Sequence, residues 1–562
     1  MKQRLLAASA IWSASILLSR LVGLVREAAL GRTLGVGGDA DLYQAAFTVP
    51  DFLNYLLAGG AMAVVLVPLQ AARRARQTAG ARPGSRPGDA SARSGGDSAA
   101  DAGARLTRAH SEPPDDAAGA DADRDAWRSI ATIANAVGIA LVVLCTIAWF
   151  AMPWLVRVAA PGFDEAQHRE LAHLSRILLP AQIFHVLGAV FSAALLARDK
   201  HAVPAFAPVV YNLGVVACGL ASGTAEGFAW GVLLGAFIGP FLMPFVACAR
   251  LGYRWAPRIE TRGSDLRAWF VRSLPIMAGF SIVVADDWFL RAEGTILASG
   301  AAATLGYAKA LLRVPVGVFG MAAGLAAYPL LARLAAESRH TELRAQLSRA
   351  LRNVTLLALF AQAVLIAAGV DIAALVYGRT RLDSAQIASV AEALSLCALG
   401  LSAWAAQPLL ARGFYALGNT WTPAVLGTAV ALAAWPLYGF ARERFGIAGL
   451  AATSAIAITA HAVVLYASLA VRLRREHAER PAGLLPFTAR ALTCFVVALG
   501  AGLTIARSLP DAATTFGSAL RLVAITTGCV AGFSATGACV GLTEIRDATA
   551  PILRRLRGAA AR

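Results

Sequence analysis

The sequence predicts an all-α polytopic membrane protein with about fourteen transmembrane helices, arranged as two six-helix lobes followed by two C-terminal helices. Of its 562 residues, 57% are hydrophobic and only 15% are charged, whereas about a quarter of a soluble protein is charged. Apolar runs of roughly 20 residues, long enough to cross about 30 Å of hydrocarbon, recur from end to end. The period-two alternation of a membrane β-barrel is absent, which favours helices.

The expected helices follow the apolar runs, and polar turns mark their ends. The first run begins after Lys2 and Arg4. It is too long for a signal peptide and no convincing cleavage site follows, so we expect a retained helix. In chain order the expected helices are 6–34, 41–70, 129–158, 170–197, 203–221, 226–249, 273–298, 301–332, 349–377, 385–416, 420–440, 446–471, 485–507 and 516–541.

The expected domain order places one long polar insert, 71–127, inside the first lobe. This segment is rich in Gly, Ala, Pro, Ser, Asp and Arg, so it cannot bury enough apolar surface to fold. We predict a disordered cytoplasmic insert, for which a spacer role is favoured over a regulatory or partner-binding one. The full order is 1–70 (helices 1–2), 71–127 (insert), 128–250 (helices 3–6), 251–272 (cytoplasmic linker), 273–472 (helices 7–12), 473–484 (cytoplasmic loop), 485–541 (helices 13–14) and 542–562 (cytoplasmic tail).

The residues that give the net charge of +17 lie mainly in the loops between the expected helices. Arg and Lys concentrate in the connections after the even-numbered helices, as in 250–267 and 472–480, so the positive-inside rule places both termini in the cytoplasm. A basic stripe interleaved with aromatic residues is missing, and we therefore expect no nucleic-acid partner. The seven cysteines show neither metal-ligand spacing nor a disulfide framework and are interpreted as small hydrophobic residues.

A weak internal repeat supports the two lobes. The segment ALLARDKHAVPAFAP (194–208) aligns with GFYALGNTWTPAVLG (413–427) at a constant offset of 219 residues. Each segment has a helix end, a short polar turn and a Pro-Ala start at the same points. Repeated halves around a central site are a recurrent transporter plan.

Charged residues within the apolar runs are the candidate functional residues. Each costs about 2.5–3.5 kcal/mol at the centre of a bilayer even on the most lenient scale, so they are rarely without a role. They cluster in expected helices 1, 2, 7 and 8, at the corresponding openings of the two halves. The set is Arg20, Arg26, Glu27, Asp41, Asp51, Asp286, Asp287, Arg291, Glu293, Lys309 and Arg313.

Helical spacing suggests how some of these charges pair. Arg20 and Glu27 are seven positions apart and share a helix face. Asp287 and Arg291 are four apart and are expected to neutralise each other along their helix.

Lys309 and Arg313 are also four apart, but they are like charges and require a counter-anion. Asp286, Glu293 or a ligand phosphate could supply it. Two interpretations remain open for the whole set: the charges fix helix packing among themselves, or they line a shared polar cavity. The excess of cations favours an anionic ligand, and guanidinium groups suit phosphate because their planar fork binds its oxygens in pairs.

Beyond these charges, the sequence resembles the MurJ (MviN) family, the lipid II flippases of the MOP exporter superfamily. The resemblance spans expected helices 1–12 and leaves out the insert. The segments that carry it are SRLVGLVREAALGRTLGVGGDADLYQAAFTVPDFLNYLLAGGA (19–61), APGF (160–163), ALLARDKHAVPAFAPVVYN (194–212), LGYAKALLRVPVGVFG (305–320), AAYPLLARLAAES (326–338) and ARGFYALGNTWTPAV (411–425).

The resemblance implies a two-lobed transporter of the bacterial inner membrane that acts in peptidoglycan biosynthesis and so in cell shape. It would flip undecaprenyl-pyrophosphate-linked disaccharide-pentapeptide by alternating access, with helices 13–14 forming a groove for the long lipid tail. The family arginines of helix 1 match Arg20 and Arg26, and the aspartate that opens helix 2 matches Asp41. Coupling to membrane potential or to a Na⁺ or H⁺ gradient is also implied, as are cell-wall synthesis proteins as partners.

The sequence departs from the family pattern at three positions. The helix 2 arginine falls on Asn54, and the glutamate of the motif that follows falls on Gly59. In helix 8 the family arginine falls on Ala310, between Lys309 and Arg313. Relocated cations would preserve a phosphate site, and a changed substrate is the alternative.

The leading hypothesis is a lipid II flippase without cofactor, metal or enzymatic activity. The alternatives are a flippase for another polyprenyl-linked oligosaccharide, such as an exopolysaccharide or O-antigen unit, a membrane glycosyltransferase or ligase, and a non-transporting cell-wall scaffold. The expected substrate-binding residues are Arg20, Arg26, Asp41, Asn54, Lys309 and Arg313, and the expected ion-binding or charge-balancing residues are Glu27, Asp286, Asp287, Arg291 and Glu293.

Overall fold

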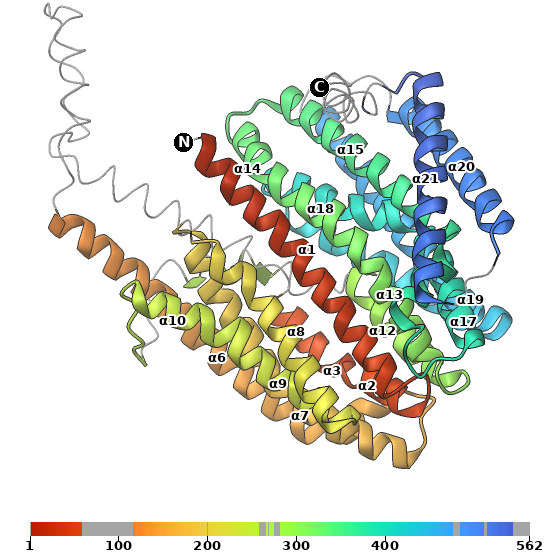
Figure 1. Ribbon diagram of the computed structural model, residues 1–562. Helices are drawn as coiled ribbons and strands as arrows, with labels where there is room; N and C mark the ends of the chain where they lie inside the picture. The colour runs from red at the N-terminus through yellow and green to blue at the C-terminus, as the bar shows by residue number, and fades with distance from the viewer. Residues whose placement is uncertain are drawn as a thin grey trace, which may run out of the picture.

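The computed structural model shows a bundle of helices, with no β-strand among the residues that it describes (Figure 1). The all-α fold class is confirmed. The structure describes residues 2–58, 116–198, 200–257, 266–267, 269–271, 273–274, 282–475, 484–510, 514–542 and 544.

The first half of the chain forms one group of helices, with α1 at its boundary with the second half (Figure 1). Helix α1 packs on α8 of the first half and also on α13 and α16 of the second. The charged residues of α1 therefore lie between the two groups. The helices of the first half are α1 (Lys2–Thr33), α2 (Gly38–Ala46), α3 (Thr48–Ala58), α6 (Asp116–Ala159), α7 (Glu165–Leu196), α8 (Ala202–Ser222), α9 (Ala225–Ala236) and α10 (Met243–Arg250).

The second half forms the other group, and the last two helices pack together along its outer edge (Figure 1). Helix α20 contacts α15, and α21 contacts α16. The helices of the second half are α12 (Ile282–Ile296), α13 (Ala301–Pro315), α14 (Ala322–Ala336), α15 (His340–Ala367), α16 (Gly369–Tyr377), α17 (Ser384–Ala398), α18 (Leu401–Ala416) and α19 (Trp421–Arg475), followed by α20 (Leu484–Ser508) and α21 (Thr515–Cys539).

Two capping boxes support the internal repeat. The Asp164 carboxylate accepts a hydrogen bond from the Gln167 backbone N–H at 2.8 Å, and the Gln167 side chain accepts one from the Asp164 N–H at 2.9 Å. Asp383 and Gln386 make the same reciprocal pair at the start of α17. Asp383 lies 219 positions after Asp164 (383 minus 164), the offset of the aligned segments. Capping boxes fix helix starts, so the two halves begin corresponding helices at equivalent residues.

Several expected helices are interrupted where the sequence has Pro or Gly. A π-helical turn, η2 (Phe237–Leu242), contains Pro240 and joins α9 to α10, and a second, η3 (Val316–Met321), follows Pro315 and joins α13 to α14. Proline removes one backbone hydrogen bond, which accounts for such local widening. The expected helices 420–440 and 446–471 are the two parts of α19, which is broken at Gly446 (φ 56°).

The described helices include eight that are long and apolar enough to span a membrane. Helices α17 and α18, bent by 45° at their junction, are together also long and apolar enough, and they make a ninth if the pair is one span. The multi-pass membrane class is thereby confirmed, while the count of fourteen stays a prediction. One expected helix, 349–377, is two helices, because the chain breaks at Ala368 between α15 and α16. Another, 41–70, is divided into α2 and α3, and its part from 59 onward lies outside the described residues.

The structure describes only the last part of the expected polar insert. Its last part, 116–127, is helical and begins α6, while 71–115 lies outside the described residues. Trp127 is buried in an apolar cluster of α6, α7 and α10, which stabilises this end of the helix through its large aromatic surface. Of the other expected cytoplasmic segments, 473–484 and 542–562 lie largely outside the described residues, and 251–272 lies partly outside them. Their boundaries stay predictions.

Candidate functional site

A cavity of about 320 Å³ lies between the two halves, bounded by α1, α2, α3, α8, α12 and α13. Ligand pockets typically measure about 300–1,000 Å³. Both halves contribute charged side chains to its wall, four cationic and three anionic. They are Arg26, Glu27, Asp51, Asp287, Arg291, Lys309 and Arg313.

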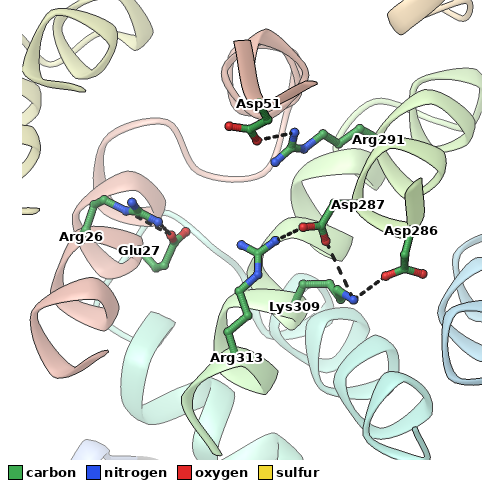
Figure 2. A network of polar contacts seen from close by, with 8 residues as sticks. All are labelled: Arg26, Glu27, Asp51, Asp286, Asp287, Arg291, Lys309 and Arg313. Atoms are coloured by element: carbon green, nitrogen blue, oxygen red, sulfur yellow. Dashed lines mark hydrogen bonds and ion pairs between the residues drawn. The ribbon is translucent and has the colours of Figure 1, made fainter. Parts of the chain in front are cut away.

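The two cations of α13 are held by the neighbouring acids of α12 (Figure 2). Lys309 Nζ lies 2.5 Å from Asp286 Oδ2 and 3.9 Å from Asp287 Oδ1. Arg313 Nη2 lies 2.5 Å from Asp287 Oδ2. The like charges on α13 thus have the counter-anions that their spacing requires. Asp286 was an expected partner, whereas Asp287 takes the place foreseen for Glu293 or a ligand phosphate.

The Lys309–Asp286 pair is almost completely buried. The Lys309 side chain is 5% exposed and that of Asp286 is 1% exposed. The Tyr438 hydroxyl donates a hydrogen bond to the second oxygen of Asp286, and Lys309 Nζ lies 4.2 Å from the centre of the Trp404 ring. Charges this deep are tolerated when hydrogen bonds and an aromatic face compensate for lost water. Asp286 is therefore fully engaged by the protein.

Arg291 on α12 pairs with a carboxylate of the first half. Its Nη1 atom lies 3.0 Å from Asp51 Oδ2 on α3. This contact corrects the expected pairing of Asp287 with Arg291 along one helix: the packing of α3 and α13 against α12 brings each residue a closer partner, Asp51 for Arg291 and Arg313 for Asp287. The Asp51–Arg291 ion pair connects the two halves directly (Figure 2).

On α1 the ion pair is formed by adjacent residues. Arg26 Nη2 lies 2.5 Å from Oε1 of the adjacent Glu27, and Arg26 Nη1 lies 3.4 Å from Asn212 Oδ1 on α8. Glu27 therefore balances Arg26, because the long guanidinium stem folds over to its neighbour. Arg20 lies nearly two turns away against η3, where a Cβ on Gly317 would come within 2.5 Å of its Nε atom.

Asp41 lies in a contact between helices and not in the cavity wall. It is buried in the contact between α2 and α13, with 2% of its surface exposed. Its carboxylate accepts hydrogen bonds from the backbone N–H groups of Gly300, at 2.5 Å, and Ala303, at 2.7 Å. A carboxylate at this place caps the N-terminus of α13 and complements its dipole. Asp41 thereby positions the helix that carries Lys309.

Two further expected residues lie away from the cavity wall. Asn54 donates a hydrogen bond to Gln182 Oε1 at 2.7 Å, within the first half. Glu293 pairs with Arg442 of α19 at 2.8 Å, within the second half. Both contacts join helices of the same half.

Of the six expected substrate-binding residues, the cavity wall contains Arg26, Lys309 and Arg313. The same wall contains polar aromatic and amide residues that the sequence does not mark, because uncharged side chains give no signal in an apolar run. Asp51 is one of the charged residues of the apolar runs but is not among the expected site residues. The residues that were missed are Tyr43, Gln44, Asp51 and Tyr211.

Comparisons with known proteins agree with this architecture. The family model described as lipid II flippase MurJ matches residues 120–523. The lipid II flippase MurJ of Burkholderia cenocepacia is 24% identical over 501 residues, which cover 87% of this chain and 86% of that protein. A probable lipid II flippase MurJ of Rhizobium tropici is 26% identical over 474 residues, which cover 82% of this chain and 79% of that protein.

Solved structures share the fold. A lipid II flippase MurJ in an inward closed conformation superposes with a TM-score of 0.67 at 17% identity, covering 94% of this chain and 99% of that one. An inward-facing multidrug resistance MATE family transporter of the MOP superfamily gives a TM-score of 0.59 at 13% identity, covering 84% and 99%. Since the family model matches more than half of the sequence, the chain belongs to the lipid II flippase MurJ family.

Proposed function

We propose that this chain moves lipid II from the cytoplasmic to the periplasmic leaflet of a bacterial inner membrane by alternating access. The observation that carries the proposal is the cavity between the two halves, to which the first half contributes Arg26 and the second contributes Arg291, Lys309 and Arg313. A ligand held by cations of both halves changes its exposure when the halves move relative to each other. Membership of the family supports the same conclusion.

The diphosphate of the substrate is the group that these cations suit. Guanidinium groups bind phosphate oxygens in pairs and keep their charge in a partly dry site. The side chains of Arg26 and Arg313 remain 24% and 43% exposed, so a ligand in the cavity can reach both. On binding, the diphosphate takes the place of the Asp287 carboxylate beside Arg313. Lys309, held by Asp286, contributes positive potential from behind.

We propose further that the carboxylates displaced by the substrate couple transport to an ion gradient. The side chains of Asp51 and Asp287 are 47% and 31% exposed. When their cationic partners turn to the diphosphate, these carboxylates are left to take up a proton or Na⁺. The flipping rate is then expected to depend on one imposed gradient. The flipping rate can be measured in vesicles with a pH gradient, with a Na⁺ gradient or with no gradient. Equal rates under these three conditions would contradict the proposed coupling.

The proposal includes cytoplasmic termini and a spacer role for the polar insert. A pure scaffold for cell-wall synthesis proteins would need the insert, whereas a transporter would not. Deletion of 71–115 is therefore expected to leave flipping unchanged. Loss of cell growth with flipping intact would instead support a partner-binding role for this segment.

The direct test is flipping by the purified protein in vesicles, with lipid II and with an undecaprenyl-diphosphate-linked O-antigen unit as separate substrates. We expect lipid II to be moved, and each of Arg26→Ala and Arg313→Ala to lower the rate at least tenfold, about 1.4 kcal/mol of lost interaction. Arg157→Ala, which removes an exposed arginine of α6, is the matched control.

Two outcomes would contradict the proposal. Wild-type rates in the Arg26→Ala, Arg313→Ala double variant would exclude the cavity as the substrate site. Movement of the O-antigen unit without movement of lipid II would favour the alternative substrate. Expression of this protein in a MurJ-depleted strain distinguishes the two substrates in cells, because only a lipid II flippase restores growth of that strain.

A further inference from the structure

A second and larger cavity, of about 1,000 Å³, forms a groove between α3, α6 and α12. We call it the α3–α6–α12 groove. Its wall is mostly apolar and includes side chains that are largely exposed, such as Phe52 (46%) and Ile147 (58%). Residues of α3, α6 and α12 that line it include Leu53, Leu144, Ala151, Leu155, Val284 and Trp288.

The groove and the cationic cavity share part of their walls. Asp51, Asp287 and Arg291 line both. The ion pair between Arg291 and Asp51, 3.0 Å long, therefore lies where the apolar groove meets the charged cavity. A molecule that occupies both spaces must be anionic at one end and apolar along the rest of its length.

This combination fits a diphosphate attached to a long hydrocarbon chain better than a small anion or an ordinary apolar ligand. The diphosphate end satisfies the cations, and the chain covers apolar wall. Within a bilayer the hydrocarbon chain leaves lipid and not water, so van der Waals packing along the groove wall, and not the hydrophobic effect, would favour its binding there.

We propose that the α3–α6–α12 groove holds the polyprenyl chain of the substrate while the diphosphate occupies the cationic cavity. This inference rests on the proposed function and deepens it, because it places the tail of the substrate. It also differs from the expectation that the segment 485–541 forms the tail groove. In Figure 1, α20 and α21, which cover most of that segment, lie at the outer edge of the second half, whereas α6 lies in the first half.

The first test maps the position of the polyprenyl chain of the substrate directly. Wild-type protein in vesicles receives a lipid II analogue with a photoreactive diazirine in its polyprenyl chain, and labelled peptides are identified by mass spectrometry. We expect labels on α3, α6 and α12. Labels confined to α20 and α21, with transport of the analogue intact, would overturn the groove while leaving the proposed function standing. Absence of transport by the wild type would remove the proposed function itself.

The second test fills the groove. Ala151→Trp places a large ring on the α6 wall, and the matched control Ala433→Trp places one on an exposed position of α19. We expect Ala151→Trp to reduce transport of full-length lipid II at least tenfold and to leave binding of inorganic pyrophosphate unchanged. Ala433→Trp should alter neither. Equal transport by both variants would overturn the proposal, as would occupancy of the groove by phospholipid in place of the labelled substrate chain.

Discussion

Replacing Lys309 by methionine removes an ammonium group from a buried ion pair without removing its apolar stem. In the wild type, Lys309 Nζ lies 2.5 Å from Asp286, and the two side chains are 5% and 1% exposed. Methionine keeps most of the packing volume. The change leaves Asp286 with the hydrogen bond from the Tyr438 hydroxyl and, among the residues that the structure describes, with no counter-charge at bonding distance.

The magnitude follows from this burial. Removal of one member of a buried ion pair costs about 3–5 kcal/mol, mostly because the remaining charge is uncompensated. Loss of the contact between the ammonium and the Trp404 ring, at 4.2 Å, adds about 0.5–2 kcal/mol. Asp286→Asn is expected to cost about 3 kcal/mol, near the lower end, because Asp287 lies 3.9 Å from Lys309 and partly replaces its partner.

A double-mutant cycle measures the interaction. Combining Lys309→Met with Asp286→Asn leaves no charge buried at the pair, so we expect the double variant to recover about 2–3 kcal/mol relative to the sum of the single losses. Equilibrium unfolding in mixed micelles titrated with sodium dodecyl sulfate gives the four free energies. The control is the exposed pair Arg157–Glu165, with side chains 56% and 65% exposed, for which coupling below about 1 kcal/mol is expected. Equal coupling in both cycles would refute the reasoning.

Three other changes test separate features of the structure. Asp41→Ala removes the cap of α13 and should lower the free energy of unfolding by about 2 kcal/mol, measured by the same titration. Gly188→Ala places a Cβ 2.0 Å from a backbone oxygen of η2 and should lower the free energy of unfolding by about 1–3 kcal/mol. The control Gly439→Ala, whose added Cβ has nothing within 4 Å, should leave it unchanged. Equal unfolding midpoints for the two variants would contradict this expectation. Asp51→Asn frees Arg291 from its ion pair, so the variant should bind inorganic pyrophosphate about fivefold more tightly, or by about 1 kcal/mol, as measured by calorimetry. Weaker binding would contradict this and show that Asp51 favours binding of the anion.

The helices were predictable from the sequence because each apolar run is long and ends in a polar turn. The run 203–221, for example, corresponds to α8 at Ala202–Ser222. The break at Ala368 was not predictable to the same degree. Its neighbours are alanine and a single glycine, which membrane helices tolerate. The backbone hydrogen bonds that end α15 and start α16 there depend on packing against α17 and α21, and composition alone contains no such information.

For the site, the sequence identified the charged residues but only some of their partners. Spacing rules relate residues on one helix, and they predicted that Asp287 pairs with Arg291 and that Arg20 and Glu27 share a helix face. The structure forms ion pairs with adjacent residues and across helices, because helix packing sets those distances. Only the need of Lys309 for a counter-anion was predictable, since two like charges four positions apart on one apolar helix must be balanced from elsewhere.

The pairing of cavity cations with the protein's own carboxylates has a consequence for the proposed transport. An unpaired set of cations would bind a diphosphate so tightly that release would be slow. In the proposed mechanism the substrate displaces Asp51 and Asp287, so part of its electrostatic gain is offset by the ion pairs that it breaks. Because Asp51 belongs to the first half and Arg291 to the second, displacing this pair also removes a direct link between the halves. Under this proposal, substrate binding in the cavity weakens a contact that opposes movement of the halves, and substrate release restores it.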